Sequence, residues 1–332
     1  MSGILNAQKA ALLPLFLVII LLGSEVINHL IRDRDLASEV LSRARFVEEV
    51  NDLVHQLQRE RGYSSGFLAS DGRYLGQEMA RERALTDRVL ASVLGQWAGG
   101  GDRLVPDPVL ADLSDVTAWR AQIDALRISG ADVLSRYTRL VNGLLGATEV
   151  QSISVTRDAL PLMIETRQAI AQAKEAAGLQ RAAGSMALGA HAMDKALHAR
   201  VLTLAAREET FLSLASLKAE AASRPLKAIK TTQFEQMDAV RRDLIDMGYG
   251  GTPPAVSPAE WFAISSAWVD RLRAEENRLN AAISHVSETA AERAKDALIL
   301  RGLCVLFAMF LLAYQFRRGN STGFQQHRQE MS

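Results

Sequence analysis

The sequence predicts an all-α protein of two stacked four-helix bundles, about eight helices in all, between two transmembrane helices. Three observations support this fold class. No stretch of useful length alternates apolar and polar residues as a half-buried strand does. Ala, Leu, Arg and Glu dominate, and aromatic residues make up only 6% of the chain, a balance that favours helix over sheet. Long stretches with helical periodicity are separated by clusters of Gly and Pro.

These clusters mark the ends of the predicted helices. They are GGGDRLVPDP at 99–108, Ser129–Gly130, SRPLK at 223–227 and MGYGGTPPAVSP at 247–258. The helices between them are predicted over 36–70, 73–98, 108–128, 131–148, 154–190, 193–222, 225–247 and 258–296. Several of these ranges are long, which fits side-by-side bundles better than a compact globule.

Two apolar runs flank the helical region. They are ALLPLFLVIILLGSEVINHL at 10–29 and LILRGLCVLFAMFLLAYQF at 298–316. Each is about long enough to cross a bilayer as a helix, so we predict transmembrane helices at 10–31 and 297–316. The first run could instead be a cleaved signal peptide, but no small-x-small pair precedes Glu25. An uncleaved anchor is the favoured interpretation.

Basic residues outside the two runs indicate the topology. Lys9 precedes the first run, and Arg317 and Arg318 follow the second, which predicts cytoplasmic ends under the positive-inside rule. The predicted parts are a cytoplasmic N-terminus at 1–9, an extracytoplasmic helical sensor domain at 32–296 and a short cytoplasmic tail at 317–332. We expect the chain in a bacterial inner membrane, with the sensor domain in the periplasm.

Composition and motifs argue against several functions. The 332 residues include 38 basic and 38 acidic side chains, so no bulk charge attracts nucleic acid and none is expected as a partner. The single cysteine, Cys304, excludes an intramolecular disulfide. There is no phosphate-binding glycine loop and no serine in a strand-to-helix elbow. We therefore expect neither an enzyme nor a cofactor.

A metal site is also weakly indicated. His191, Asp194 and His198 can share one face of a helix, but a metal needs three or four convergent ligands. His285 is the only other obvious candidate. Solvated polar residues on a bundle helix are the favoured interpretation, and no metal is predicted.

Anion binding fits the sequence better, because arginines interrupt an amphipathic helix in LQRERGYSSG at 57–66. Positions 59 and 61 are about 200° apart around a helix, which places Arg61 on the apolar stripe and Arg59 off it. The two could simply be surface charges paired with Glu60, Asp52 or Glu49. Alternatively, at least one points between helices, where a guanidinium needs a partner and matches a planar oxyanion.

The residues after Arg61 support the second interpretation. Gly62, Ser64 and Ser65 have small side chains that would leave volume for a ligand, and the two hydroxyls can donate hydrogen bonds. We therefore expect an anion clamp at this point of the helix.

Three segments resemble the nitrate- and nitrite-sensing (NIT) domain family. The first is HQLQRERGYSSGFLAS at 55–70, with the Gln, Glu-Arg-Gly and small residues of the family's first helix. The others are EAAGLQRAAGSMALGA at 175–190 and WFAISSAWVDRLRAEENRL at 261–279. The resemblance implies two stacked four-helix bundles that hold nitrate or nitrite through arginines from separate helices.

The family pattern also implies site residues. Arg61 takes the Glu-Arg-Gly role with Arg59 as its neighbour, Arg181 takes the central role, and Ser65 is a further ligand candidate. In the last helix, alignment on Leu272–Arg273 puts Trp268 where a ligand-facing arginine is expected. Arg271 or Arg273 would have to substitute for it.

The predicted function is a membrane-anchored sensor that binds nitrate or nitrite and passes a helix shift across the membrane. We expect a homodimer. Because only a short polar tail follows Arg317, we also expect a separate signalling partner, unless the sequence is a fragment or a degenerate gene. Two alternatives stay open: a helical membrane-anchored scaffold or interaction protein, and a sensor of another small anion.

Overall fold

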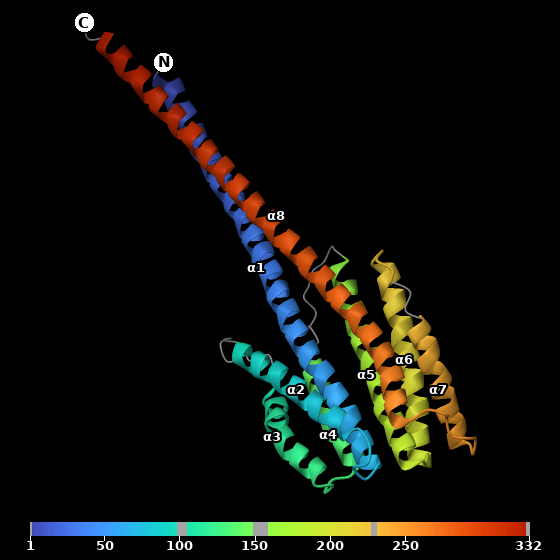
Figure 1. Cartoon of the computed structure of the whole chain (residues 1–332). Coiled ribbons are helices and arrows are strands. Elements are labelled where there is room, and N and C mark those ends of the chain that lie inside the picture. Colours follow the sequence, from blue (N-terminus) through green and yellow to red (C-terminus); the bar gives the residue numbers. More distant parts are fainter. Residues whose placement is uncertain (1, 98–104, 149–158, 227–230, 330–332) are drawn as a thin grey trace. The chain divides into compact units, whose positions relative to one another are not determined.

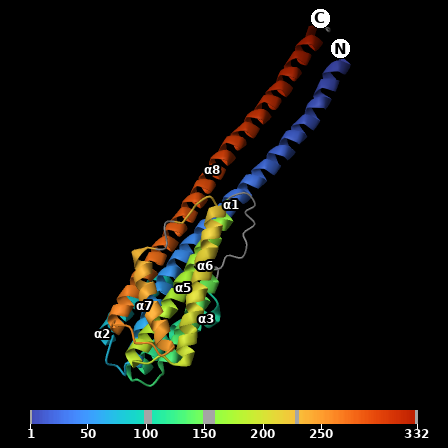
Figure 2. The same ribbon diagram turned by 90° about the vertical axis from the view of Figure 1, so that its right-hand side faces the viewer.

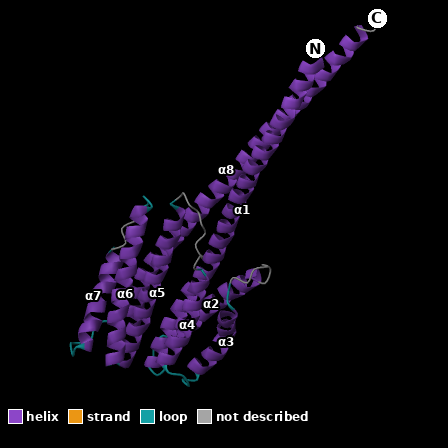
Figure 3. Cartoon of the chain, turned by 180° about the vertical axis from the view of Figure 1, so that it is seen from behind, coloured by secondary structure: helices purple, strands orange, loops and turns teal. Residues whose placement is uncertain are grey.

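The computed structural model describes residues 2–97, 105–148, 159–226 and 231–329. In these residues the chain forms eight α-helices and no strand, which confirms the predicted all-α class (Figures 1 and 3). In chain order the helices are α1 (Ser2–Ala69), α2 (Gly76–Trp97), α3 (Asp107–Asp124), α4 (Gly130–Ala147), α5 (Leu160–Ala190), α6 (Lys195–Ala221), α7 (Thr232–Gly248) and α8 (Pro258–Gln329).

Local sequence explains several helix ends. The Ser129 hydroxyl accepts a hydrogen bond from the Asp132 backbone N–H at 3.1 Å and so caps α4, and Asp194 caps α6 in the same way. Helix α3 ends earlier than predicted because Leu126 adopts a left-handed conformation, with φ at 51°. Residues 154–158 and 227–230, also predicted to be helical, lie outside the described residues.

The chain divides into two compact units, residues 1–43 with 284–332 and residues 44–283. The first unit contains the start of α1 and the end of α8. A Cβ atom added at Gly23 in α1 would lie 3.0 Å from Cγ2 of Val305 in α8. The two helices therefore pack closely at this glycine.

The predicted transmembrane helices find no support among the described side chains. Within these side chains, no helix has an apolar stretch long enough to cross a membrane. Residues 10–17, 19 and 22 of the first predicted span, and 312, 315 and 316 of the second, lie outside the described side chains.

Residues 44–283 contain two main apolar cores. Helices α1 to α4 supply most of the first core, whose buried side chains include Leu57, Met79, Trp119 and Tyr137, and Phe262 on α8 also belongs to it. Helices α5 to α8 form the second core, with Ile170, Leu212, Met237 and Trp268 among its buried side chains. Figures 1 and 2 show α5, α6 and α7 alongside one another. Each predicted bundle thus has its own core.

Helices α1 and α5 approach closely where the two bundles meet. A Cβ atom added at Gly189 in α5 would lie 3.3 Å from the backbone oxygen of Gly66 in α1. A Cβ atom added at Gly66 would lie 3.2 Å from the Cβ atom of Ser185. These glycines bring the two backbones together, so that long polar side chains further along the helices can reach across the junction.

Candidate anion site between α1, α5 and α8

The guanidinium of Arg61 lies in the interior, as the apolar stripe on α1 predicts. Arg61 has an exposed fraction of 0%. Its Nη1 and Nη2 atoms donate to the two carboxylate oxygens of Glu175 on α5, at 2.7 and 3.0 Å, and Nη1 also donates to the Thr138 hydroxyl on α4 at 3.1 Å. The planar oxyanion expected at Arg61 is therefore supplied by the protein itself.

Arg181 on α5 lies in the same buried region. Its Nη2 atom donates to the backbone oxygen of Gln58 at 3.0 Å, and the Gln58 side chain donates to Glu175 at 2.8 Å. Gln58 thus connects Arg181 with the Arg61–Glu175 pair. This agrees with the expectation that α5 brings Arg181 close to Arg61.

Arg181 differs from Arg61 because no described carboxylate pairs with it. Its other partners are the Ser266 hydroxyl, at 2.9 Å from Nη1, and the Phe262 ring, whose centroid is 4.6 Å from Cζ. The Nε atom has no hydrogen-bond partner among the described residues. Burial, and then the charges of Arg59 and Arg61, lower the pKa of Arg181 to about 9. It is still charged at pH 7, so an uncompensated positive charge lies in the core.

Arg59 points away from this buried region, as the angle around α1 predicts. Its side chain is 23% exposed. The Nε atom donates to Glu82 at 2.8 Å, and Nη2 donates to the Tyr63 hydroxyl at 3.3 Å. Arg59 is therefore already paired with a carboxylate, but that carboxylate is Glu82 on α2 and not Glu60, Asp52 or Glu49 as the surface interpretation expected.

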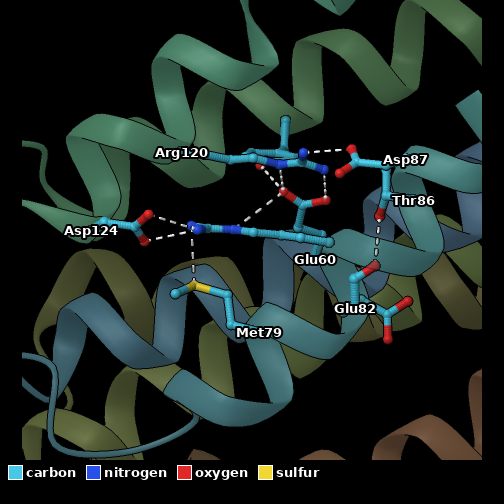
Figure 4. Close-up of polar contacts among 9 residues, drawn as sticks. Glu60, Met79, Glu82, Thr86, Asp87, Arg120 and Asp124 are labelled. Carbon is cyan, nitrogen blue, oxygen red and sulfur yellow. Dashed lines mark hydrogen bonds and ion pairs between the residues drawn. The ribbon is translucent and has the colours of Figure 1, made fainter.

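Glu60, between the two arginines in sequence, is the centre of another polar network. Arg120 donates to both Glu60 oxygens at 2.7 and 2.8 Å, and the Tyr137 hydroxyl donates at 2.7 Å. Figure 4 shows the Glu60 carboxylate facing the guanidinium of Arg120, which also donates to Asp87. Because its partners come from α3 and α4, Glu60 fixes the orientation of α1 within the first bundle.

Small residues near Arg61 make room for protein side chains. A Cβ atom added at Gly62 would lie 2.7 Å from Cε2 of Phe262 and 3.4 Å from Nε of Arg181. A Cβ atom added at Gly178 would lie 3.3 Å from Nη2 of Arg61. The expectation that Gly62 leaves volume for a ligand is therefore corrected, since the Phe262 ring takes up that volume.

Three buried hydroxyls lie on the helices that carry the two arginines. Ser64 and Ser65 on α1 and Ser185 on α5 have hydroxyl oxygens without a hydrogen-bond partner among the described residues. Ser65 and Ser185 are each four positions beyond a buried arginine, so each shares a helix face with that arginine. These hydroxyls are free to donate to an added acceptor.

The residues of α8 that were predicted to reach the anion do not lie beside Arg181. Trp268 is fully buried in the second core, where its Nε1 atom donates to Glu208 on α6 at 2.6 Å. Arg273 donates to Asp52 at 2.6 Å, and Arg271 lies 3.7 Å from Glu275. Instead, α8 contributes Phe262 and Ser266 to the neighbourhood of Arg181. Ser266 and Trp268 are two positions apart, so their side chains point to different sides of the helix.

Four residues of the site could not be assigned from the sequence: Gln58, Glu175, Phe262 and Ser266. The sequence shows that these residues are polar, acidic or aromatic, but it does not show which residue each of them contacts. Glu175 lies within the α5 segment that carries Arg181, and Phe262 follows the tryptophan that opens the last helix. Which carboxylate or ring meets which arginine depends on contacts more than 80 residues apart in sequence.

The residues considered for a metal have structural roles. His191 ends α5 in a left-handed conformation, Asp194 caps α6, and His198 packs edge-on against Tyr249 at 4.5 Å between ring centroids. Over the described part of the chain, no group of three or more potential ligand side chains could hold a metal ion.

Comparison with known families decides the identity of the helical region. Residues 52–284 match the family described as nitrate and nitrite sensing, the NIT domain. The chain belongs to the NIT family. The match covers both four-helix bundles and includes Arg61, Gly62, Arg181 and Phe262.

A solved structure shares the fold of this NIT chain. It is described as the structure of the NasR transcription antiterminator, with a TM-score of 0.59 and 20% sequence identity. The similarity covers 85% of this chain and 84% of that one. No curated protein matches. At this identity the likeness concerns the fold alone.

Proposed function

We propose that this NIT protein senses nitrate or nitrite by binding the anion at Arg181, next to Arg61. The observation that carries the proposal is the state of Arg181: it is fully buried, it has no described carboxylate partner, and its Nε atom is free to donate. A buried charge without a partner is costly, and a monovalent anion would compensate it. The family's association with nitrate and nitrite supports the same ligands.

Nitrate suits this environment because it is planar and its oxygens can accept hydrogen bonds in its plane. A guanidinium offers N–H groups in a matching plane. The Nε atom of Arg181 and the unpartnered hydroxyls of Ser65 and Ser185 are candidate donors. The Phe262 ring would be an apolar wall, since it already lies against Arg181.

The same arrangement offers a mechanism for the signal. An anion at Arg181 would bring negative charge close to Glu175, which would weaken the pair between Glu175 and Arg61. The anion-free and anion-bound states would then differ in how α1 and α5 are held together. A ligand that binds one of two such states more tightly shifts the equilibrium between them. The Glu175 side chain would be the group that changes its position when the anion binds.

Membrane anchoring and signal output belong to this proposal. On α8 the described side chains Leu300, Leu303, Leu306, Phe307 and Phe310 are each about 60% exposed. An exposed apolar row of this size is suited to lipid or to a partner helix. We infer a bacterial inner-membrane anchor, a periplasmic sensor domain, a homodimer and a separate signalling partner. Light scattering of the detergent-solubilised chain tests the homodimer.

Calorimetry on the full-length chain in detergent tests the ligand. Nitrate and nitrite should each produce saturable heat, and acetate and chloride should bind more weakly. Arg181→Met should abolish the high-affinity heat, whereas Arg207→Met, an exposed arginine bonded to Gln172 on the outside of the second bundle, should leave it unchanged. Equal heats for all four anions would favour a sensor of another small anion, and no heat at millimolar anion would favour the scaffold alternative.

A further inference from the structure

Helix α5 carries three buried cations at intervals of seven residues. They are Arg167, Lys174 and Arg181, with exposed fractions of 3%, 0% and 0%. Seven residues are close to two helical turns, so the three side chains lie near one face of α5, about 10 Å apart along its axis. Only Arg181, the last of them, belongs to the anion site described above.

The middle cation is fully compensated. Lys174 forms an ion pair with Glu276 on α8, and both side chains are completely buried. The Arg61–Glu175 pair lies next to it in sequence, because Glu175 directly follows Lys174 on α5. Glu276 pairs with Lys174 through one oxygen, while its Oε1 atom has no hydrogen-bond partner among the described residues. The one negative charge of Glu276 thus faces two cations, Lys174 and Arg167.

Arg167 has no such partner. Its side chain makes no hydrogen bond or ion pair with any residue that the structure describes, and its buried Nε atom lacks an acceptor. Glu276 is close enough to be felt as a charge, but its ion pair is with Lys174. Arg167 is thus a 3% exposed side chain whose buried Nε atom is free to donate.

Arg167 also stays charged at neutral pH. Burial lowers its pKa to about 10, and the nearby charge of Glu276 opposes that shift. A group with this pKa remains protonated at pH 7, so the positive charge is not removed by loss of a proton. An enclosed charge of this kind is strongly unfavourable unless a counter-charge accompanies it.

We propose that Arg167 holds a second small monovalent anion, such as chloride or nitrate, about 21 Å along α5 from Arg181. A single net positive charge calls for a single negative one, and an exposed fraction of only 3% calls for a small ion. Oxyanions and halides both satisfy this chemistry. The proposal is independent of ligand binding at Arg181, because neither residue contributes a described contact to the other's surroundings.

Stoichiometry tests this site. The full-length chain in detergent is titrated with nitrate by calorimetry, and its unfolding midpoint is followed against chloride or nitrate, with gluconate keeping ionic strength constant. The variants are Arg167→Met, Arg167→Lys, which keeps the charge, and Arg181→Met. Arg207→Met is the matched surface control.

The wild-type chain should bind two anions and Arg167→Met only one. Arg167→Met should also lose part of the anion-dependent rise in unfolding midpoint, and Arg167→Lys should keep it. If Arg167→Met matches wild type in both measurements, or if Arg181→Met alone removes all anion dependence, the second site does not exist. If Arg181→Met leaves binding unchanged while Arg167→Met abolishes it, the ligand proposed at Arg181 fails and the site at Arg167 stands.

Discussion

Arg61 on α1 and Glu175 on α5 form a bidentate ion pair in which both side chains are fully buried. The pair joins the two four-helix bundles across 114 residues of sequence. Arg61, which was expected to bind an external anion, is therefore already bound to a carboxylate of the protein.

Glu175→Gln should increase nitrate affinity by about tenfold, which corresponds to roughly 1.4 kcal/mol. Glutamine is close in shape to glutamate but carries no charge, so it no longer competes with nitrate for the positive field of Arg61 and Arg181. Calorimetry measures the change. Glu60→Gln is the matched control, because Glu60 is an equally buried carboxylate whose partners are Arg120 and Tyr137. The same affinity in both variants would show that Glu175 is purely structural.

Arg61→Met should lower the free energy of unfolding by roughly 3–5 kcal/mol, because it leaves the Glu175 carboxylate buried without its cation. The double variant Arg61→Met with Glu175→Met should recover most of this loss, since an apolar pair needs no compensation. Denaturant unfolding measures both. Arg139→Met, which breaks the largely exposed pair with Asp112, should cost only about 0–1 kcal/mol. A double variant no more stable than Arg61→Met would contradict the argument.

Gly62→Ala should destabilise the protein by roughly 1–3 kcal/mol, because the new methyl group would overlap the Phe262 ring. It should also weaken nitrate binding, since Phe262 lies against Arg181. Gly95→Ala is the control: a Cβ atom there meets nothing within 4 Å, and in an exposed helix this change should stabilise by about 0.5–1 kcal/mol. Thermal unfolding separates the two, and stabilisation by both would mean that Phe262 moves aside freely.

Glu208 should make stability depend on pH in a direction opposite to that of most carboxylates. Burial raises its pKa, although Arg241, Gln180 and Trp268 partly oppose the shift. Because the folded state then binds the proton more tightly than the unfolded state, this residue lowers stability as the pH rises above about 4.5. The stability of Glu208→Gln relative to wild type should therefore increase from pH 4 to pH 7. A constant difference across this range would exclude the effect.

The helical architecture could be predicted because the sequence features that mark helix ends and buried faces are local. Gly and Pro clusters mark the helix ends, and the position of Arg61 on an apolar stripe correctly indicated a buried side chain. The errors at helix ends were also local, as at Leu126, whose left-handed backbone ends α3.

The partners of the arginines could not be predicted, because helical periodicity gives the face of a residue and not the residue opposite. Glu175 was one of many acidic residues in the chain, and nothing near it in sequence indicates Arg61. Trp268 shows a further limit. Matching it to an expected arginine from the neighbouring Leu-Arg pair ignored the angle around α8, which turns Trp268 toward Glu208 and leaves Ser266 beside Arg181.

The spacing of Arg167, Lys174 and Arg181 has a consequence for how this chain can change during evolution. Inserting or deleting one residue between them would rotate everything beyond that point by about 100°, and would turn at least one cation away from its present surroundings. Only changes of about seven residues would preserve the arrangement. Differences in length between this protein and its descendants should therefore accumulate in connections such as Ser70–Leu75, while the length of α5 is kept.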